Sequence, residues 1–150
     1  MDNYSVIGKR IKSRDSVAKV TGKAVFAGDM KLKGMLYGKV LRSEVAHARI
    51  LGIDISKAME LKGVKAVVTC EDTPLIKYSI HPLMADKLAF EDKKVRYIGD
   101  EIAAVAAVDE ATAAKALSLI KVDLEELEGV FDPVEAMKED VSRIDRKSVV

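Results

Sequence analysis

The segment Arg42–Arg49 brings two arginines, a serine and a histidine close together in the sequence. Guanidinium groups bind carboxylates and phosphates through paired hydrogen bonds, so a loop of this composition could bind an anion or pack against a partner. The alternative is a polar connection between two strands whose arginine side chains are solvated. Composition alone favours this second interpretation.

Other residues of the types that catalyse reactions or bind metals lack suitable neighbours. Cys70 has no second cysteine and no nearby histidine, so we interpret it as a mostly buried, inert thiol. His47 and His81 are far apart, and neither has a histidine or cysteine four residues away, so no metal site is predicted. The acidic cluster Glu125, Glu126 and Glu128 is typical of a solvated turn. The sequence therefore predicts no catalytic, cofactor-binding or metal-binding residue.

The composition is that of an ordinary globular protein. Hydrophobic residues make up 49% and charged residues 33% of the 150 residues, and tryptophan is absent, so the core must be aliphatic. A single cysteine excludes an internal disulfide and indicates a reducing compartment. The N-terminus has no apolar signal-like segment. We therefore expect one cytoplasmic domain with no membrane partner.

Charge is separated along the chain although the net charge is only +1. Basic residues dominate residues 1–50, and acidic residues dominate residues 101–150. The basic arm, residues 1–23, could bind nucleic acid or an acidic protein as part of a free-standing binding module. Few aromatic residues interleave with its charges, so a nucleic-acid partner is not expected. The alternative is that the two ends of the chain meet and neutralise each other.

Secondary-structure signals are strongest in the second half of the chain. Glu101–Val108 (EIAAVAAV) predicts a strand covered on both faces, entered through a tight turn at Gly99–Asp100. Asp109 can cap a helix, and Ile120–Leu124 predicts the next strand. The expected buried face of that helix consists of Ala111, Ala114, Leu117 and Leu119.

A similar strand–helix–strand unit is expected earlier in the chain. After a first strand at Met35–Arg42 comes a second at Ala48–Ile55. Ser56 should cap a short helix that stops at Gly63, and Val64–Thr69 predicts the following strand.

The remaining segments are less regular. Residues 70–95 predict a loop with a short strand or turn at Ala85–Phe90. Asp132–Pro133–Val134–Glu135 has the sequence of a helix start, with an acidic cap and proline in the first turn, and that helix should reach about Lys138–Asp140. We expect residues 1–140 to form the domain with its basic arm, and residues 141–150 to be a linker or frayed tail.

Several short motifs, taken in order, resemble the N-terminal α/β-hammerhead domain of the molybdopterin-binding large subunit of molybdenum hydroxylases. This is the xanthine dehydrogenase, aldehyde oxidase and 4-hydroxybenzoyl-CoA reductase family. The resemblance covers roughly residues 6–138, and its specificity lies in the succession of the motifs. They are Thr21–Gly22–Lys23–Ala24, Gly34–Met35–Leu36–Tyr37, Leu41–Arg42–Ser43, His47–Ala48–Arg49–Ile50, Gly63–Val64–Lys65–Ala66–Val67–Val68–Thr69, Val95–Arg96–Tyr97–Ile98–Gly99–Asp100–Glu101–Ile102–Ala103–Ala104–Val105, and Val130–Phe131–Asp132–Pro133 with Glu135–Ala136.

The resemblance implies an α+β fold, the α/β-hammerhead, with a mixed β-sheet and short strand–helix–strand units. It also implies a parent oxidoreductase that contains molybdopterin, iron–sulfur clusters and possibly FAD. In that family the glycine-rich pterin loops and the base-like glutamate lie in later domains, so no catalytic residue and no cofactor is assigned to this chain. The isolated chain is expected to be inactive.

The implied partners are the downstream molybdopterin-binding domains and the iron–sulfur subunit. An exposed apolar patch should mark the surface where those domains pack, and self-association of the isolated domain could cover it. The residues proposed for interdomain contact are Arg42, Ser43, His47, Arg49, Gly99 and Asp100.

Overall fold

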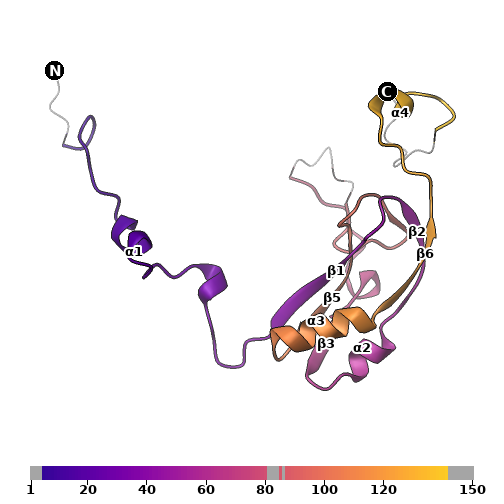
Figure 1. Cartoon of the computed structure of the whole chain (residues 1–150), viewed down its shortest axis with the longest axis horizontal. Helices are drawn as coiled ribbons and strands as arrows, with labels where there is room; N and C mark the ends of the chain where they lie inside the picture. Colours follow the sequence, from indigo (N-terminus) through magenta and orange to yellow (C-terminus); the bar gives the residue numbers. More distant parts are fainter. Residues whose placement is uncertain (1–4, 81–84, 86, 142–150) are drawn as a thin grey trace. The chain divides into compact units, whose positions relative to one another are not determined.

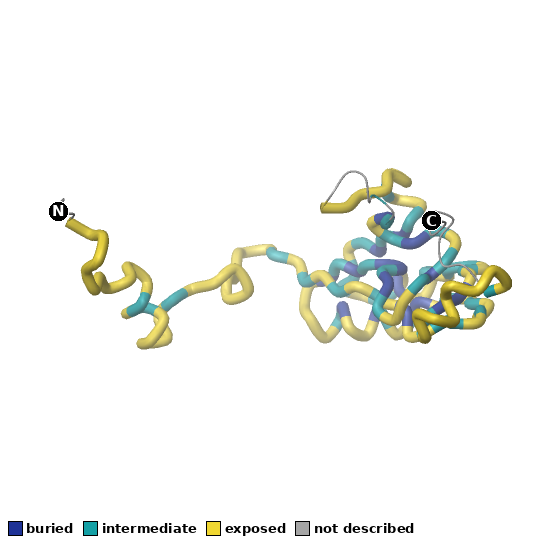
Figure 2. Tube along the Cα trace, turned by 90° about the horizontal axis from the view of Figure 1, so that it is seen from above, coloured by how far each residue is buried: buried dark blue, intermediate teal, exposed yellow. Residues whose placement is uncertain are grey.

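The computed structural model describes residues 5–80, 85 and 87–141. It divides into two units, residues 1–35 and residues 36–150. The first unit contains a short helix, α1 (Ser16–Val20), and a 3₁₀ turn at Ala27–Asp29 (Figure 1), where an irregular arm was expected. Neither helix has a buried residue, and in Figure 2 this segment is yellow with short teal stretches and no dark blue.

The second unit contains two sheets of three strands each. In the first sheet, β5 (Glu101–Ala107) lies between β1 (Tyr37–Arg42) and β3 (Val64–Val68), and both pairings are antiparallel. No residue of β5 is exposed, because it has neighbours on both edges and side chains packed on both faces. The strand predicted from EIAAVAAV is confirmed.

The second sheet has β2 (Ala48–Asp54) at its centre, between β4 (Lys94–Val95) and β6 (Lys121–Glu126). Both of its pairings are antiparallel. Each strand–helix–strand unit begins in one sheet and ends in the other (Figure 1). The expected α+β fold is confirmed, but all pairings among the described strands are antiparallel, where a mixed sheet was expected.

Helix α2 (Ser56–Glu60) follows β2 directly. The prediction that Ser56 caps it is wrong: Ser56 is the first helical residue, and its backbone N–H donates to the Asp54 carboxylate at 2.9 Å. The Ser56 hydroxyl donates to the same carboxylate oxygen at 2.6 Å. The carboxylate two residues before Ser56 therefore accepts both bonds, and Ile55 occupies the N-cap position without a side-chain bond.

Helix α3 (Glu110–Leu119) begins at the predicted cap, where the Asp109 carboxylate accepts a 2.7 Å hydrogen bond from the Thr112 N–H. Its buried face was predicted only in part: Leu117 and Leu119 are half-buried against the core, but Ala111 and Ala114 are exposed, and Ala113 and Ala116 are buried instead. A helix this rich in alanine has little contrast between its faces, so the packed side cannot be chosen from periodicity.

Helix α4 (Pro133–Ala136) confirms the third predicted cap. The Asp132 carboxylate accepts from the backbone N–H groups of Val134 and Glu135, at 2.7 and 3.2 Å. The helix ends before the expected Lys138–Asp140. The predicted turn at Ala85–Phe90 and the predicted tail lie partly outside the described residues.

Small side chains allow α3 and α2 to approach the first sheet closely. Ala58 of α2, Ala116 of α3 and Ala103 of β5 all have 0% exposure. They form one core cluster with Val67, Val105 and Ile120, while Ala48, Val95 and Ile102 form a second against the other sheet. Burial of these aliphatic side chains is the main stabilising contribution.

Candidate functional site

The turn before β5 is held against the end of β1 by two backbone hydrogen bonds. Ser43 N–H donates to the Asp100 carbonyl, and Gly99 N–H donates to the Ser43 carbonyl, both at 2.8 Å. Gly99 has φ +98°, a conformation that L side chains rarely adopt, so glycine suits this turn. The predicted tight turn is confirmed, and it brings Ser43, Gly99 and Asp100 together.

Arg42 joins the same group through its side chain. Its Nη1 donates to the Gly99 carbonyl at 2.8 Å and to the Glu101 carboxylate at 2.6 Å. The Arg42 guanidinium therefore has an intrachain partner, and an external anion would have to compete with Glu101 for it.

Arg49 lies elsewhere, in β2, and pairs with Glu125 of β6 across the second sheet. Both side chains are about half exposed. The two arginines of the 42–49 connection therefore each pair with a carboxylate of this chain, and do not converge on an anion site. This geometry supports the interpretation of the segment as a polar connection.

Asp100 is the most deeply buried acid at the turn, with 1% exposure. Its Oδ2 accepts from the Arg96 backbone N–H at 3.0 Å, and the Lys87 ammonium lies 3.6 Å from its Oδ1. Lys87 also pairs with Glu101 and stacks over the Tyr97 ring, 4.7 Å from its centroid.

These contacts shift two ionisation equilibria in opposite directions. Burial opposes the charged form of Lys87, but Glu101 and Asp100 raise its pKa overall. Burial also opposes the charged form of Glu101, but hydrogen bonds from Lys87 and Arg42 lower its pKa overall. Both groups are therefore held in their charged forms.

Glu91 is the second buried acid, with 3% exposure, and its carboxylate accepts a 2.6 Å hydrogen bond from Arg96. Burial, followed by the charge of Asp100, raises the pKa of Glu91, and Arg96 opposes that shift. We call Lys87, Glu91, Arg96, Asp100 and Glu101 the carboxylate cluster. The sequence did not indicate that these side chains pair with one another. Most of them come from the irregular segment before β5, where no periodic pattern marks them.

His47 lies on a groove of about 280 Å³, which Arg96 of the carboxylate cluster also lines. The side chain is buried, with 4% exposure, and its Nδ1 lies 2.8 Å from the Glu128 carbonyl oxygen. The groove, here called the His47 groove, is lined by Ala46, His47, Arg96, Tyr97, Ile98, Gly129, Val130 and Phe131.

The rim of the His47 groove is exposed and apolar. Ile98 is 67% exposed and Phe131 is 82% exposed, and Tyr97 beside them is 44% exposed. The sequence suggested an exposed apolar patch, and this groove has that character. Its residues come from three segments far apart in the chain, so no local pattern indicated where it would form.

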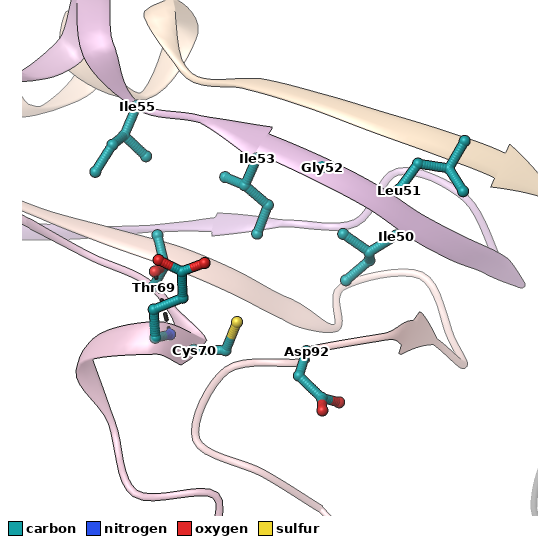
Figure 3. A pocket seen from close by; sticks show the side chains of 9 residues that line it. Ile50, Leu51, Gly52, Ile53, Ile55, Thr69, Cys70 and Asp92 are labelled. Atoms are coloured by element: carbon teal, nitrogen blue, oxygen red, sulfur yellow. Dashed lines mark hydrogen bonds between the residues drawn. The ribbon is translucent and has the colours of Figure 1, made fainter.

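A second cavity, of about 240 Å³, contains the thiol of Cys70. Figure 3 shows Ile50 and Ile53 of β2 pointing toward the 3₁₀ helix that carries Cys70. The thiol is half-buried, and burial, followed by Asp92 and Glu71, raises its pKa. A raised pKa leaves little thiolate at neutral pH, which agrees with the predicted inert thiol.

The donor set does not fit an iron–sulfur cluster, because such clusters take several cysteine ligands and this chain has one cysteine. Across residues 5–80, 85 and 87–141, no three His, Cys, Asp or Glu side chains are grouped so that they could hold a metal ion. In the same ranges, no helix has the length and apolar character needed to cross a membrane.

Residues 21–128 match the family model described as "Aldehyde oxidase and xanthine dehydrogenase, a/b hammerhead domain". The chain is 42% identical over 141 residues to a probable xanthine dehydrogenase subunit from Bacillus subtilis, covering 93% of this chain and 19% of the relative. It is 42% identical over 138 residues to the nicotinate dehydrogenase large molybdopterin subunit of Eubacterium barkeri, covering 92% of this chain and 32% of the relative.

Solved structures show the same likeness. Reconstituted CO dehydrogenase from Oligotropha carboxidovorans superimposes with a TM-score of 0.80 at 38% identity, covering 89% of this chain and 17% of that one. Aldehyde oxidoreductase from Desulfovibrio gigas gives a TM-score of 0.76 at 34% identity, covering 87% and 16%. The chain thus spans between about a sixth and a third of the proteins that it matches.

Proposed function

This chain belongs to the α/β-hammerhead domain family of aldehyde oxidases and xanthine dehydrogenases, and from that premise we propose that it is a structural domain of a molybdenum hydroxylase large subunit. It packs against the molybdopterin-binding part of the enzyme and performs no catalysis alone. The parent enzyme is a molybdenum-dependent oxidoreductase of the cytoplasm, a compartment suited to a chain with a single cysteine.

The observation that carries this proposal is the exposed apolar rim of the His47 groove. Ile98 and Phe131 are more than half exposed and line the same groove. Contiguous exposed apolar surface on a folded domain marks a site where another protein surface packs. The Ser43–Gly99 and Ser43–Asp100 hydrogen bonds fix the turn that holds Ile98, so the surface is pre-formed.

Five of the six residues suggested by the sequence for interdomain contact lie at the proposed contact surface. Arg42, Ser43, Gly99 and Asp100 shape the edge of the contact surface, and His47 lies in its groove. Arg49 is paired with Glu125 on the second sheet and is a weaker candidate for interdomain contact.

The chemistry of the reaction is assigned to other parts of the enzyme. The molybdopterin centre supplies oxidation of the substrate, while the iron–sulfur clusters of the parent enzyme, and FAD where it is present, transfer electrons. In this chain the carboxylates of Glu91 and Glu101 are paired with Arg96, Lys87 or Arg42, an arrangement that stabilises a fold. Selection of the substrate is likewise assigned to the later domains.

The test is association with a molybdopterin-binding polypeptide. We define the remainder polypeptide as the Bacillus subtilis relative without the segment that matches this chain. Fluorescently labelled chain should bind it saturably, as should the segment deleted from that relative, which serves as the positive control. Binding by the control but not by this chain would overturn the proposal.

A second measurement examines the chain alone. Elemental analysis and visible absorbance of the purified 150-residue protein should show neither molybdenum nor iron, and dye-linked oxidoreductase activity should be at background. Stoichiometric molybdenum would contradict a purely structural role. Salt-sensitive binding to DNA, without binding to the remainder polypeptide, would support a free-standing module instead.

A further inference from the structure

We infer that the His47 groove receives an extended segment of the molybdopterin-binding polypeptide, which inserts a large apolar side chain and donates a hydrogen bond to His47 Nε2. This inference rests on the proposed function and specifies the contact that the packing requires. Four observations carry it: a fixed tautomer, an unpartnered buried nitrogen, apolar walls and the size of the groove.

The tautomer follows from the partner of Nδ1. The Glu128 carbonyl oxygen, 2.8 Å away, can only accept a hydrogen bond, so Nδ1 of His47 must carry a hydrogen. In a neutral imidazole with a hydrogen on Nδ1, Nε2 is an acceptor. The group that completes this site must therefore be a donor.

Nε2 of His47 is buried and has no hydrogen-bond partner among the described residues. A buried polar atom without a partner costs about 1–3 kcal/mol relative to a satisfied one. His47 is one of the residues that line the groove, and its Nδ1 is held by the Glu128 carbonyl. A donor that enters the groove and reaches Nε2 would remove this cost, which gives the site a polar requirement that an apolar patch alone lacks.

The walls of the groove are suited to an apolar side chain. A Cβ atom added at Gly129 would lie 3.0 Å from both Cε2 and Cζ of Phe131, so the aromatic ring lies directly against the glycine backbone. Phe131 is nevertheless 82% exposed, because its other face has no covering group among the described residues. Ile98 and Tyr97 line the same groove.

The size of the groove selects a short segment. An apolar cavity of about 150 Å³ accommodates a benzene ring, so the 280 Å³ of the His47 groove suits a large apolar side chain together with a neighbouring peptide unit. A backbone N–H of that peptide unit supplies the required donor.

The occupant is a polypeptide because of what the relatives contain. The chain corresponds to 19% of the Bacillus subtilis relative and 32% of the nicotinate dehydrogenase subunit, so most of each relative is protein that lies beyond the matched segment. A second copy of this chain is the competing occupant, and the test separates the two.

The experiment compares variants of the full 150-residue chain for binding to the remainder polypeptide. Ile98→Ala and Phe131→Ala remove the exposed walls and should each weaken binding about tenfold or more, as central interface residues do. Leu51→Ala is the matched control, because Leu51 of β2 is 66% exposed, like Ile98, but lies outside the groove. Its affinity should be unchanged.

His47→Asn tests the acceptor. Its side-chain amide can still donate to the Glu128 carbonyl, but it has no acceptor at the Nε2 position, so binding should weaken about tenfold. Long-range ¹⁵N–¹H NMR of the unmodified protein provides a measurement that does not depend on a variant. It should show the Nδ1–H tautomer in the free chain and a shift of the Nε2 resonance when the remainder polypeptide is added.

The outcomes are distinguishable. If the unmodified chain does not bind while the control segment does, the proposed function fails, and this inference fails with it. If the chain binds but the groove variants bind as well as Leu51→Ala, only the groove inference is overturned. Groove-dependent dimerisation without binding would overturn it by identifying a second copy as the occupant, and an Nε2–H tautomer would overturn the donor requirement.

Discussion

Substitution of Arg96 by methionine isolates the contribution of the buried ion pair beside the groove. Arg96 Nη1 lies 2.6 Å from the Glu91 carboxylate, and Glu91 is 3% exposed. Methionine keeps most of the aliphatic length of arginine but cannot pair with the acid. The backbone N–H of residue 96, which donates to Asp100, is unaffected by the change.

The magnitude follows from the burial of the charge left behind. Removal of one partner of a buried ion pair typically costs about 3–5 kcal/mol, because the other charge remains buried and uncompensated. The Arg96 side chain is 28% exposed, so the environment is not fully dry. We therefore expect Arg96→Met to lower the free energy of unfolding at pH 7 by about 3 kcal/mol.

The loss should depend on pH in a defined direction. Burial and the charge of Asp100 already raise the pKa of Glu91, and removal of Arg96 raises it further. A carboxyl group with a raised folded-state pKa binds more protons in the folded than in the unfolded protein, so the variant gains stability as pH falls through that pKa. The deficit relative to the unmodified chain should therefore shrink as pH falls from neutrality through the raised folded-state pKa toward 4.5, the ordinary value for Glu.

Urea unfolding followed by circular dichroism measures both effects. Arg49→Met is the matched control, because the exposed Arg49–Glu125 pair should contribute at most about 1 kcal/mol. The double variant Glu91→Gln/Arg96→Met should recover much of the loss and show little pH dependence of the deficit. Equal losses for the two arginine variants, or a deficit that does not change with pH, would refute the reasoning.

Three further predictions concern the fold around the site, each measured by urea unfolding. Val105 of β5 has 2% exposure, so Val105→Ala should lower the free energy of unfolding by about 2–3 kcal/mol through lost burial and a new cavity. Val108 is 45% exposed, so Val108→Ala should lower it by less than about 1 kcal/mol. Gly99→Ala should cost about 1–2 kcal/mol through its φ of +98° alone, because nothing lies within 4 Å of an added Cβ; no loss would mean the turn adopts another conformation. Hydrogen bonds from Lys87 and Arg42 lower the pKa of Glu101 although burial opposes this shift. The charged Glu101 therefore contributes stability at neutral pH, and this stability is lost as pH falls below about 4.3 and through the folded-state pKa. Glu101→Gln should make the unfolding free energy less sensitive to pH there, and an unchanged slope would contradict this assignment.

Local signals in the sequence predicted the elements whose structure is determined locally. Asp109 and Asp132 cap the helices that follow them, because a short acidic side chain next to free backbone N–H groups needs no distant partner. EIAAVAAV predicted a central strand, because its apolar residues leave no face suited to water.

The errors arose where local signals were ambiguous. In α3, alanines lie on both sides of the helix, and only packing against the first sheet selects Ala113 and Ala116 as the buried pair. At α2, Ser56 has a side chain of the type that caps helices, but the Asp54 carboxylate accepts hydrogen bonds from its backbone N–H and its hydroxyl.

The site itself depends on contacts between distant segments. His47 meets the Glu128 carbonyl, and Arg42 meets the Gly99 carbonyl, through pairings that only the folded sheets create. The sequence identified Arg42 and His47 as candidate contact residues but could not show that Arg42 forms an ion pair with Glu101 of the same chain. It also could not show that Nε2 of His47 has no hydrogen-bond partner among the described residues.

Hydrogen–deuterium exchange of the 150-residue chain, with and without the remainder polypeptide, tests the central claim most directly. A structural domain that packs through the His47 groove should show slower amide exchange at residues 46–47, 96–98 and 129–131 in the mixture. Exchange at α3, which lies against the first sheet, should stay the same. Unchanged exchange around the groove, or protection confined to the basic arm, would contradict the claim.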